Sequence, residues 1–294
     1  MSTPSERASG STSAEDTEPA CGRLLGAATY GFLFAAPLVD ALGELADAGI
    51  KLVELTAAPP HVQLGSFDRA ARDMLRRRID QLDLRLVSVN PTYLDINMCS
   101  LNDRFREESI RQLTETLRLC QDLGAEMLVL FAGRRHVLAP APMSLVEPML
   151  LHGLETLLEE ADRLGVTLAL ENGPTLVVER GSDVARLCAH FDGRLRAVFD
   201  VANARMVEDV AEGLETVLPH TALVHLSDTT PRRWQHAAVG EGDIDFADVA
   251  QVLHRAGYPG PSIMEVVDID RPLEALVESA SALAARGWVL QQQE

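Results

Sequence analysis

Eight short apolar runs, each followed by a longer amphipathic stretch, limit what this 294-residue chain can fold into. Parallel strands need helical crossovers, and near-continuous Val, Leu and Ile runs are typical of strands buried on both faces. An open doubly wound sheet could use the same alternation, but no GxGxxG motif follows the first run, and eight units close a barrel. We therefore predict a single (β/α)8 TIM barrel. Its strands are expected at residues 24–29, 50–56, 84–90, 125–131, 166–172, 195–201, 221–227 and 261–267.

Helix boundaries are marked between these runs. Ser144–Glu147 and Asp245–Asp248 resemble capping boxes, in which side chains satisfy the free amides at a helix start. A glycine just before a strand is typical of a helix end, because it adopts the left-handed conformation without strain. Such glycines stand at positions 49, 124, 165 and 257. We expect eight helices, one with each strand.

Composition narrows the possible functions. The net charge of −18 argues against nucleic-acid binding, because gripping phosphate backbones needs clustered Lys and Arg. No apolar run approaches the roughly 20 residues of a membrane helix. Residues 1–22 are polar and lack the apolar core of a signal peptide. We expect them to be a disordered tail, followed by one barrel domain over residues 23–294.

The four cysteines, at positions 21, 99, 120 and 188, are far apart and form no CxxC pair. Free thiols in a reducing cytoplasm are therefore expected. Homodimerisation is plausible for a barrel of this size, although no stretch of the sequence requires it.

The second half of the chain ends its strands in polar groups. Glu171 and Asp200 end the fifth and sixth predicted strands, and His225 and Glu265 lie in the seventh and eighth. Since barrel chemistry lies at the carboxyl ends of the strands, these groups would meet at one mouth. Taken singly, each has another explanation: a rim carboxylate, a helix cap at Asp200, or a core histidine.

Their conjunction favours a metal site. Three converging buried carboxylates would repel one another, and each uncompensated buried ion costs several kcal/mol. A divalent cation would neutralise them and take neutral imidazole as a fourth ligand. The set of Glu171, Asp200, His225 and Glu265 suits one Mn²⁺, the favoured ion, or Mg²⁺, Co²⁺ or Zn²⁺.

The motifs LALEN, FDVAN, LVHLSD, His236 before Gly240-Glu-Gly242, and SIMEV follow one another in a familiar order and spacing. In this the chain resembles the xylose isomerase-like TIM barrel superfamily of sugar and sugar-phosphate isomerases, epimerases, dehydratases and endonuclease IV-type nucleases. The resemblance covers residues 24–287 and implies that the four residues above hold one metal. It also implies that Glu171 and Glu265 act as an acid/base pair on opposite faces of the substrate carbon.

Two positions depart from relatives. Epimerases and endonuclease IV commonly carry a histidine where this chain has Asn203, and the Asp-x-His of the nucleases is replaced by Trp234-Gln235-His236. Two ligands of the nuclease zinc cluster are therefore missing, which disfavours nuclease activity. The change at position 203 also bears on any substrate contact made there.

Further candidates for substrate binding lie in the loops after strands. His236 is expected near the metal or the substrate, and Arg232 could bind a hydroxyl, carboxylate or phosphate, although solvated loop arginines are common. Asn90 could bond a substrate hydroxyl. Arg134, Arg135 and His136 follow the fourth strand, where they could receive an anionic group or offset acidic helices. Glu54 and His61, near the second strand, are read as structural.

Three functions fit these residues. The first is a metal-dependent isomerase or epimerase of a sugar, sugar phosphate or cyclitol, working through an enediolate that the cation stabilises. The second is a dehydratase of a keto-cyclitol or dehydroshikimate-like acid on the same site. The third is a barrel without catalysis that serves as a binding partner, against which the Glu171/Glu265 pair argues.

Overall fold

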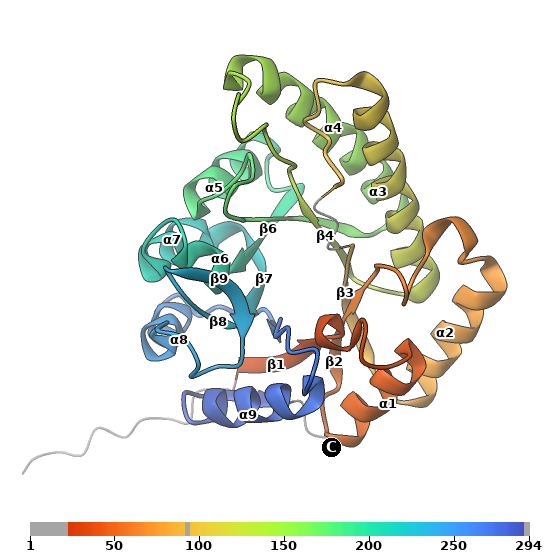
Figure 1. The fold of residues 1–294 in the computed structure, drawn as a ribbon, viewed down its shortest axis with the longest axis vertical. Helices are drawn as coiled ribbons and strands as arrows, with labels where there is room; N and C mark the ends of the chain where they lie inside the picture. Colours follow the sequence, from red (N-terminus) through yellow and green to blue (C-terminus); the bar gives the residue numbers. More distant parts are fainter. Residues whose placement is uncertain (1–22, 92–94, 291–294) are drawn as a thin grey trace, which may run out of the picture.

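A closed ring of eight parallel strands lies at the centre of the molecule, with helices packed around its outside (Figure 1). The computed structural model describes residues 23–91 and 95–290, so the predicted tail at residues 1–22 lies outside the described residues. The barrel strands are β1 (Arg23–Ala28), β2 (Leu52–Thr56), β3 (Arg85–Asn90), β4 (Met127–Phe131), β5 (Thr167–Glu171), β6 (Leu195–Asp200), β7 (Thr221–Leu226) and β10 (Ser262–Met264).

The ring is closed by β10, which pairs in parallel with β7 on one side and with β1 on the other. The predicted (β/α)8 barrel is thus confirmed. The eighth strand is shorter than predicted, and Glu265 lies one residue beyond its end, with its backbone N–H donating to the carbonyl of Leu226 at 3.1 Å.

Helices surround the strands and bury their apolar sides against the ring. They are α1 (Leu38–Asp47), α2 (Arg69–Gln81), α3 (Asp103–Leu123), α4 (Met143–Leu164), α5 (Gly181–His190), α6 (Val201–Arg205), α7 (Val210–Val217), α8 (Phe246–Arg255) and α9 (Pro272–Ala284). Short 3-10 turns are η1 (Tyr30–Phe32), η2 (Leu64–Ser66) and η3 (Leu218–His220). The described residues contain one helix more than predicted, because two helices, α6 and α7, connect β6 to β7.

Helix boundaries follow local chemistry. Asp245 caps α8, as predicted, by accepting from the backbone amides of Ala247 and Asp248. Gly124 and Gly165 end α3 and α4 in the left-handed conformation, also as predicted. The predicted capping box at Ser144–Glu147 is wrong: α4 begins at Met143, after Pro142, which makes no side-chain cap. The ring of Pro142 fixes its φ at −57°, and with ψ at 142° the chain enters the helix in an extended conformation without a capping side chain.

Three strands outside the eight of the ring were not predicted. The segment after β7, read as a loop, contains an antiparallel hairpin of β8 (Asp228–Thr230) and β9 (Arg233–Ala237). A short strand, β11 (Trp288–Leu290), adds in parallel to the start of β1. The hairpin matters for function because it carries His236 over the carboxyl ends of the strands.

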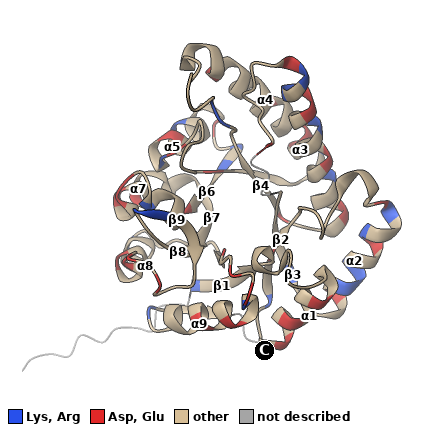
Figure 2. Cartoon of the chain, viewed as in Figure 1, with Lys and Arg blue, Asp and Glu red and all other residues tan. Residues whose placement is uncertain are grey.

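Residues of both charge signs are spread along the outer helices (Figure 2). Many form exposed ion pairs within or between neighbouring helices, such as Arg111 with Glu108 and Arg186 with Glu147. None of the described helices is long and apolar enough to cross a membrane. Cys99, Cys120 and Cys188 are buried free thiols, and burial raises the pKa of Cys99 to about 12, while Cys21 lies outside the described residues.

Candidate metal centre

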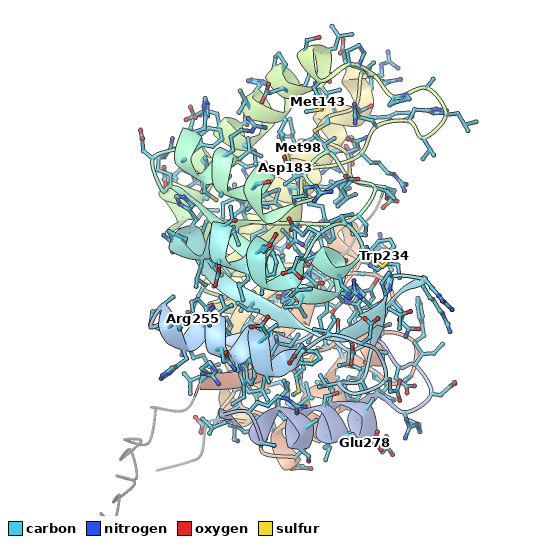
Figure 3. All side chains as sticks on the ribbon, turned by 90° about the vertical axis from the view of Figure 1, so that its left-hand side faces the viewer. Met98, Met143, Asp183, Trp234, Arg255 and Glu278 are labelled. Carbon is cyan, nitrogen blue, oxygen red and sulfur yellow. The ribbon has the colours of Figure 1, made fainter. Side chains whose placement is uncertain are left out.

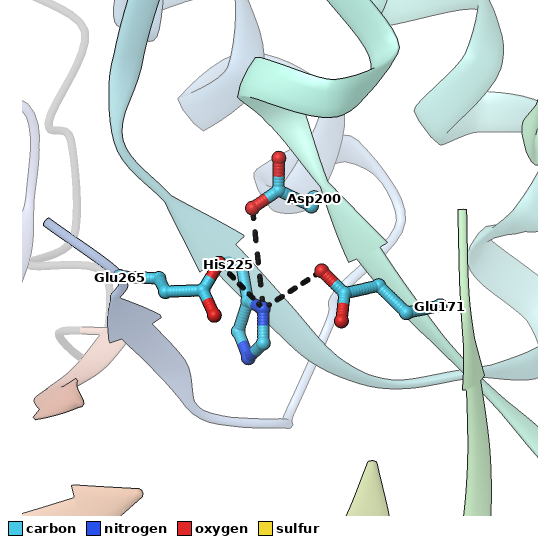
Figure 4. A group of neighbouring side chains, drawn as sticks. All are labelled: Glu171, Asp200, His225 and Glu265. Carbon is cyan, nitrogen blue, oxygen red and sulfur yellow. Dashed lines mark hydrogen bonds and ion pairs between the residues drawn. The ribbon is translucent and has the colours of Figure 1, made fainter. Parts of the chain in front are cut away.

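The four predicted ligands lie together at the carboxyl ends of neighbouring strands. Each offers one ligand atom, and these atoms all lie within 4.8 Å of one another. Figure 4 shows Glu171 and Glu265 on either side of His225, with Asp200 at a third side. Register explains the arrangement, since Asp200 on β6 lies directly opposite His225 on β7.

One nitrogen of His225 faces all three carboxylates. Its Nδ1 lies 3.2 Å from Oε1 of Glu171, 3.7 Å from Oε2 of Glu265 and 3.9 Å from Oδ2 of Asp200. Glu171, Asp200 and His225 are fully buried, and Glu265 is 4% exposed. The carboxylates therefore converge in a place where water does not screen their repulsion.

Electrostatic strain within this cluster appears in the pKa values. Burial raises the pKa of Glu171 to about 7, and the nearby charges of Asp200 and Glu54 add to this, against the opposing effect of His225. Burial likewise raises the pKa of Glu265 well above its usual value. The His225 pKa is raised because the negative charges of Glu54, Glu171 and Glu265 outweigh its burial. Without a cation, protons must supply the missing positive charge.

Unpaired oxygens show that the cluster fits a cation. Oε2 of Glu171 and Oδ2 of Asp200 are buried, and neither has a hydrogen-bond partner within the described part of the chain. Buried polar atoms are normally bonded, so two such oxygens in one cluster leave coordination positions that a cation can fill. Carboxylate oxygens with one imidazole nitrogen are a donor set that Mn²⁺, Mg²⁺, Co²⁺ and Zn²⁺ accept.

The hairpin closes over this cluster. His236 on β9 places its Nδ1 3.2 Å from Oε2 of Glu265 and 3.8 Å from Oδ2 of Asp200, and within 3.0 Å of the Ser227 hydroxyl. Burial lowers the pKa of His236, which favours its neutral form. His236, expected near the metal or the substrate, thus lies beside two of the four predicted ligands.

Trp234 attaches the hairpin to the barrel. Its indole N–H donates to Oδ1 of Asn203 at 2.9 Å, and the amide of Asn203 donates to the carbonyl of Asn172 at 3.0 Å and to Oε1 of Glu171 at 3.4 Å. In Figure 3, Trp234 lies at the edge opposite the end where Arg255 closes α8. Asn203 therefore lies within the cluster, between the hairpin and Glu171.

Asn90 lies on the other side of the cluster. Its amide nitrogen is 3.2 Å from Oε1 of Glu54 and 3.3 Å from Oε1 of Glu265. Like Asn203, it contacts one of the two glutamates for which the family resemblance implies an acid/base role.

The structure does not gather the remaining candidates around the four ligands. Arg232, in the turn of the hairpin, is exposed. Arg134, Arg135 and His136 line a separate surface pocket of about 540 Å³, to which none of the four ligands contributes. There Nδ1 of His136 accepts from the backbone amide of Ala139 at 3.1 Å.

Glu54, which the sequence analysis expected to be structural, also lies at this cluster. It is fully buried, and its Oε2 lies 3.0 Å from Nε2 of His225. The sequence shows only that this carboxylate lies inside the apolar run IKLVELT. A glutamate that faces solvent would give the same pattern, so the pattern does not indicate burial.

The fold and this centre define a barrel with a buried carboxylate–imidazole site at the carboxyl ends of its strands. The chain belongs to the family described as xylose isomerase-like TIM barrel, whose pattern matches residues 42–286.

Three similar proteins illustrate the range of that family. An L-ribulose-5-phosphate 3-epimerase, UlaE, of Escherichia coli O139:H28 is 26% identical over 247 residues, which cover 82% of this chain and 84% of that protein. A solved structure of a D-tagatose 3-epimerase-like protein is 20% identical, with a TM-score of 0.76 over 90% of this chain and 98% of the other. The IOLI protein, solved with a zinc atom, is 14% identical, with a TM-score of 0.75 over 90% and 98% of the two chains.

Proposed function

We propose that this chain is a metal-dependent epimerase of a small ketose or ketose phosphate, and that Glu171 and Glu265 are its acid/base pair. The observation that carries the proposal is the position of these two carboxylates on either side of His225, each within 3.7 Å of the same imidazole nitrogen (Figure 4). The names of the similar proteins, a ribulose-phosphate epimerase and a tagatose epimerase-like protein, support the substrate class.

Glu171, Asp200, His225 and Glu265 would hold one divalent cation, with Mn²⁺ favoured. When bound, the cation acts as a Lewis acid that stabilises the negative charge of an enediolate. The unpaired oxygens of Glu171 and Asp200 support this assignment, as does the zinc atom of the IOLI structure.

The two glutamates would divide the proton transfer between them. One carboxylate removes the proton from the carbon next to the substrate carbonyl, and the other returns a proton to the opposite face, which inverts that carbon. Their raised pKa values, about 7 for Glu171, suit groups that must take and give protons near neutral pH. The proton that is returned differs from the proton that is removed, and it comes from a carboxyl group that exchanges with solvent between turnovers.

The hairpin and the two asparagines would complete the substrate site. We propose that His236, beside Glu265, binds a substrate hydroxyl, and that Asn203 and Asn90 act through the glutamates that their amides contact. Arg232, in the hairpin turn, and Arg134 and His136, in the loop after β4, would meet an anionic end of a longer substrate.

Solvent exchange tests the function directly. Metal-loaded protein in D2O is incubated with a panel of ketoses and ketose 5-phosphates, and NMR follows deuterium entering the carbon next to the carbonyl. We expect exchange with at least one substrate. Glu171→Gln and Glu265→Gln keep an oxygen ligand but lose the base, so each should lower the rate about 10²–10⁴-fold.

Glu208→Gln is the matched control, because Glu208 accepts from the backbone amide of Gly181, away from the metal centre. It should exchange at the wild-type rate. A folded, metal-loaded protein that exchanges no substrate of the panel would refute the epimerase assignment.

A further inference from the structure

A fourth carboxylate, that of Glu54 on β2, contacts the second ring nitrogen of His225. Its Oε2 lies 3.0 Å from Nε2 of His225, while the other three carboxylates face Nδ1. Glu54 and His225 are both fully buried, so no water competes for this contact. The imidazole therefore lies between the Glu54 carboxylate at Nε2 and the other three carboxylates at Nδ1.

Two further hydrogen bonds reach the Glu54 carboxylate from the described residues, and in both the partner is a donor. The Ser88 hydroxyl donates to Oε2 at 2.6 Å, and the amide of Asn90 donates to Oε1 at 3.2 Å. Register brings the first pair together, since Glu54 and Ser88 are neighbours across β2 and β3. An ionised carboxylate only accepts hydrogen bonds, so Nε2 of His225 must be the donor in its contact with Glu54.

A neutral imidazole that carries its proton on Nε2 presents a lone pair at Nδ1. We propose that Glu54 is a positioning residue that holds His225 in this tautomer, with Nδ1 directed at the cation. Metal-binding histidines commonly donate their other N–H to a carboxylate, which fixes the tautomer and the ring plane. The inference rests on the proposed function only in requiring that the cluster binds a divalent ion.

The same network reaches a second ligand. The amide nitrogen of Asn90 lies 3.3 Å from Oε1 of Glu265 as well as near Glu54. Glu54 therefore orients His225 directly and Glu265 through Asn90, so that strands β2 and β3, which supply no ligand, set the geometry of the centre.

Zinc affinity of the metal-free protein tests this role. Glu54→Gln keeps the size of the side chain, but one amide oxygen cannot accept from Ser88, Asn90 and His225 together. One of these three donors then faces the N–H of the glutamine side-chain amide. We expect the variant to bind zinc about 10–100-fold more weakly than the wild type, as measured by competition with a chelator. Glu208→Gln, a carboxylate-to-amide change remote from the cluster, should bind zinc like the wild type.

NMR of zinc-loaded wild type, with ¹⁵N-labelled histidine, reads the tautomer without any variant and so does not depend on whether Glu54→Gln folds. We expect a slowly exchanging proton on Nε2 of His225 and none on Nδ1. A proton on Nδ1, or wild-type zinc affinity in folded Glu54→Gln, would overturn the proposal. Zinc held through Nδ1 in a protein that epimerises no sugar would leave it standing while the proposed function fails.

Discussion

Asp228 organises the chain that follows the hairpin, and Gly242 makes room for it. The buried carboxylate accepts from the backbone amides of Thr229, Gly240 and Ile244, at 2.9, 2.8 and 3.2 Å. A Cβ atom at Gly242 would lie 2.2 Å from Oδ1 of Asp228. The loop behind His236 is therefore built around one acidic side chain that tolerates no larger neighbour.

Gly242→Ala should destabilise the protein by about 1–3 kcal/mol, because backbone or carboxylate must move to admit the methyl group. Urea unfolding followed by circular dichroism measures this change. Gly65→Ala is the control, since a Cβ atom there meets no atom within 4 Å, and it should leave the unfolding midpoint nearly unchanged. Equal midpoints for both variants would contradict the packing argument.

The residues of the buried cluster could be picked out because each polar group stands out in or next to an apolar strand. Glu171, Asp200, His225 and Glu265 follow from strand ends that must converge in a barrel. Glu54 could not be assigned in the same way. Its burial depends on whether its side chain points into the barrel, which follows from the register of β2 against β3, and that register is a property of the folded sheet.

At the scale of elements, the β8–β9 hairpin is the part that the sequence pattern concealed. The stretch DTTPRRWQHA has no alternation of apolar and polar residues, so it reads as a loop. The hairpin is stabilised by contacts that form only in the folded chain. These are the hydrogen bond that Asp228 accepts from the amide of Gly240 and the one that the indole of Trp234 donates to Asn203. The eight barrel strands, in contrast, have the apolar runs that burial on both faces demands.

Trp234→Phe should keep the hairpin but remove the bond from the indole to Asn203. The Asn203 amide would then lose an orienting partner and hold Glu171 less firmly. Loss of one hydrogen bond is worth about 1 kcal/mol, so we expect kcat to fall up to about tenfold. Steady-state kinetics measure this, once a substrate is known.

Gln235→Ala is the control for that variant. Gln235 lies on the same strand, but its bond to Thr229 is made by the backbone amide and survives the change. Its kcat should match the wild type. A Trp234→Phe enzyme as fast as the control would mean that the indole contact does not reach Glu171.

At the scale of the whole molecule, the buried acidic cluster makes the free energy of unfolding depend on pH, and under the proposed function also on the concentration of a divalent cation. The pKa of Glu171 is about 7 when folded against an ordinary 4.5, so the folded state binds the extra proton between these values. Its contribution to stability is therefore present below about pH 4.5 and lost as the pH rises to about 7. The raised pKa of His225 acts in the same direction above its ordinary value.

The Tm of metal-free protein should thus fall between about pH 5 and about pH 8. A divalent cation replaces those protons, so the rise in Tm on adding Mn²⁺ should be larger at the higher pH. At a thousandfold excess over Kd, binding adds about 4 kcal/mol to the unfolding free energy. Differential scanning fluorimetry at both pH values measures the two rises, and equal rises would contradict the linkage.

The closure of the ring by β10 has a consequence for how the protein is made. Glu54 and Glu265 come from early and late parts of the chain, and the ring closes only when β10 pairs with both β7 and β1. A nascent chain on the ribosome folds from its amino end, so it carries an incomplete carboxylate–imidazole cluster until residue 265 emerges. Under the proposed function, capture of the ion and completion of the fold become a single late event, and a chain that stops before Pro261 should acquire neither.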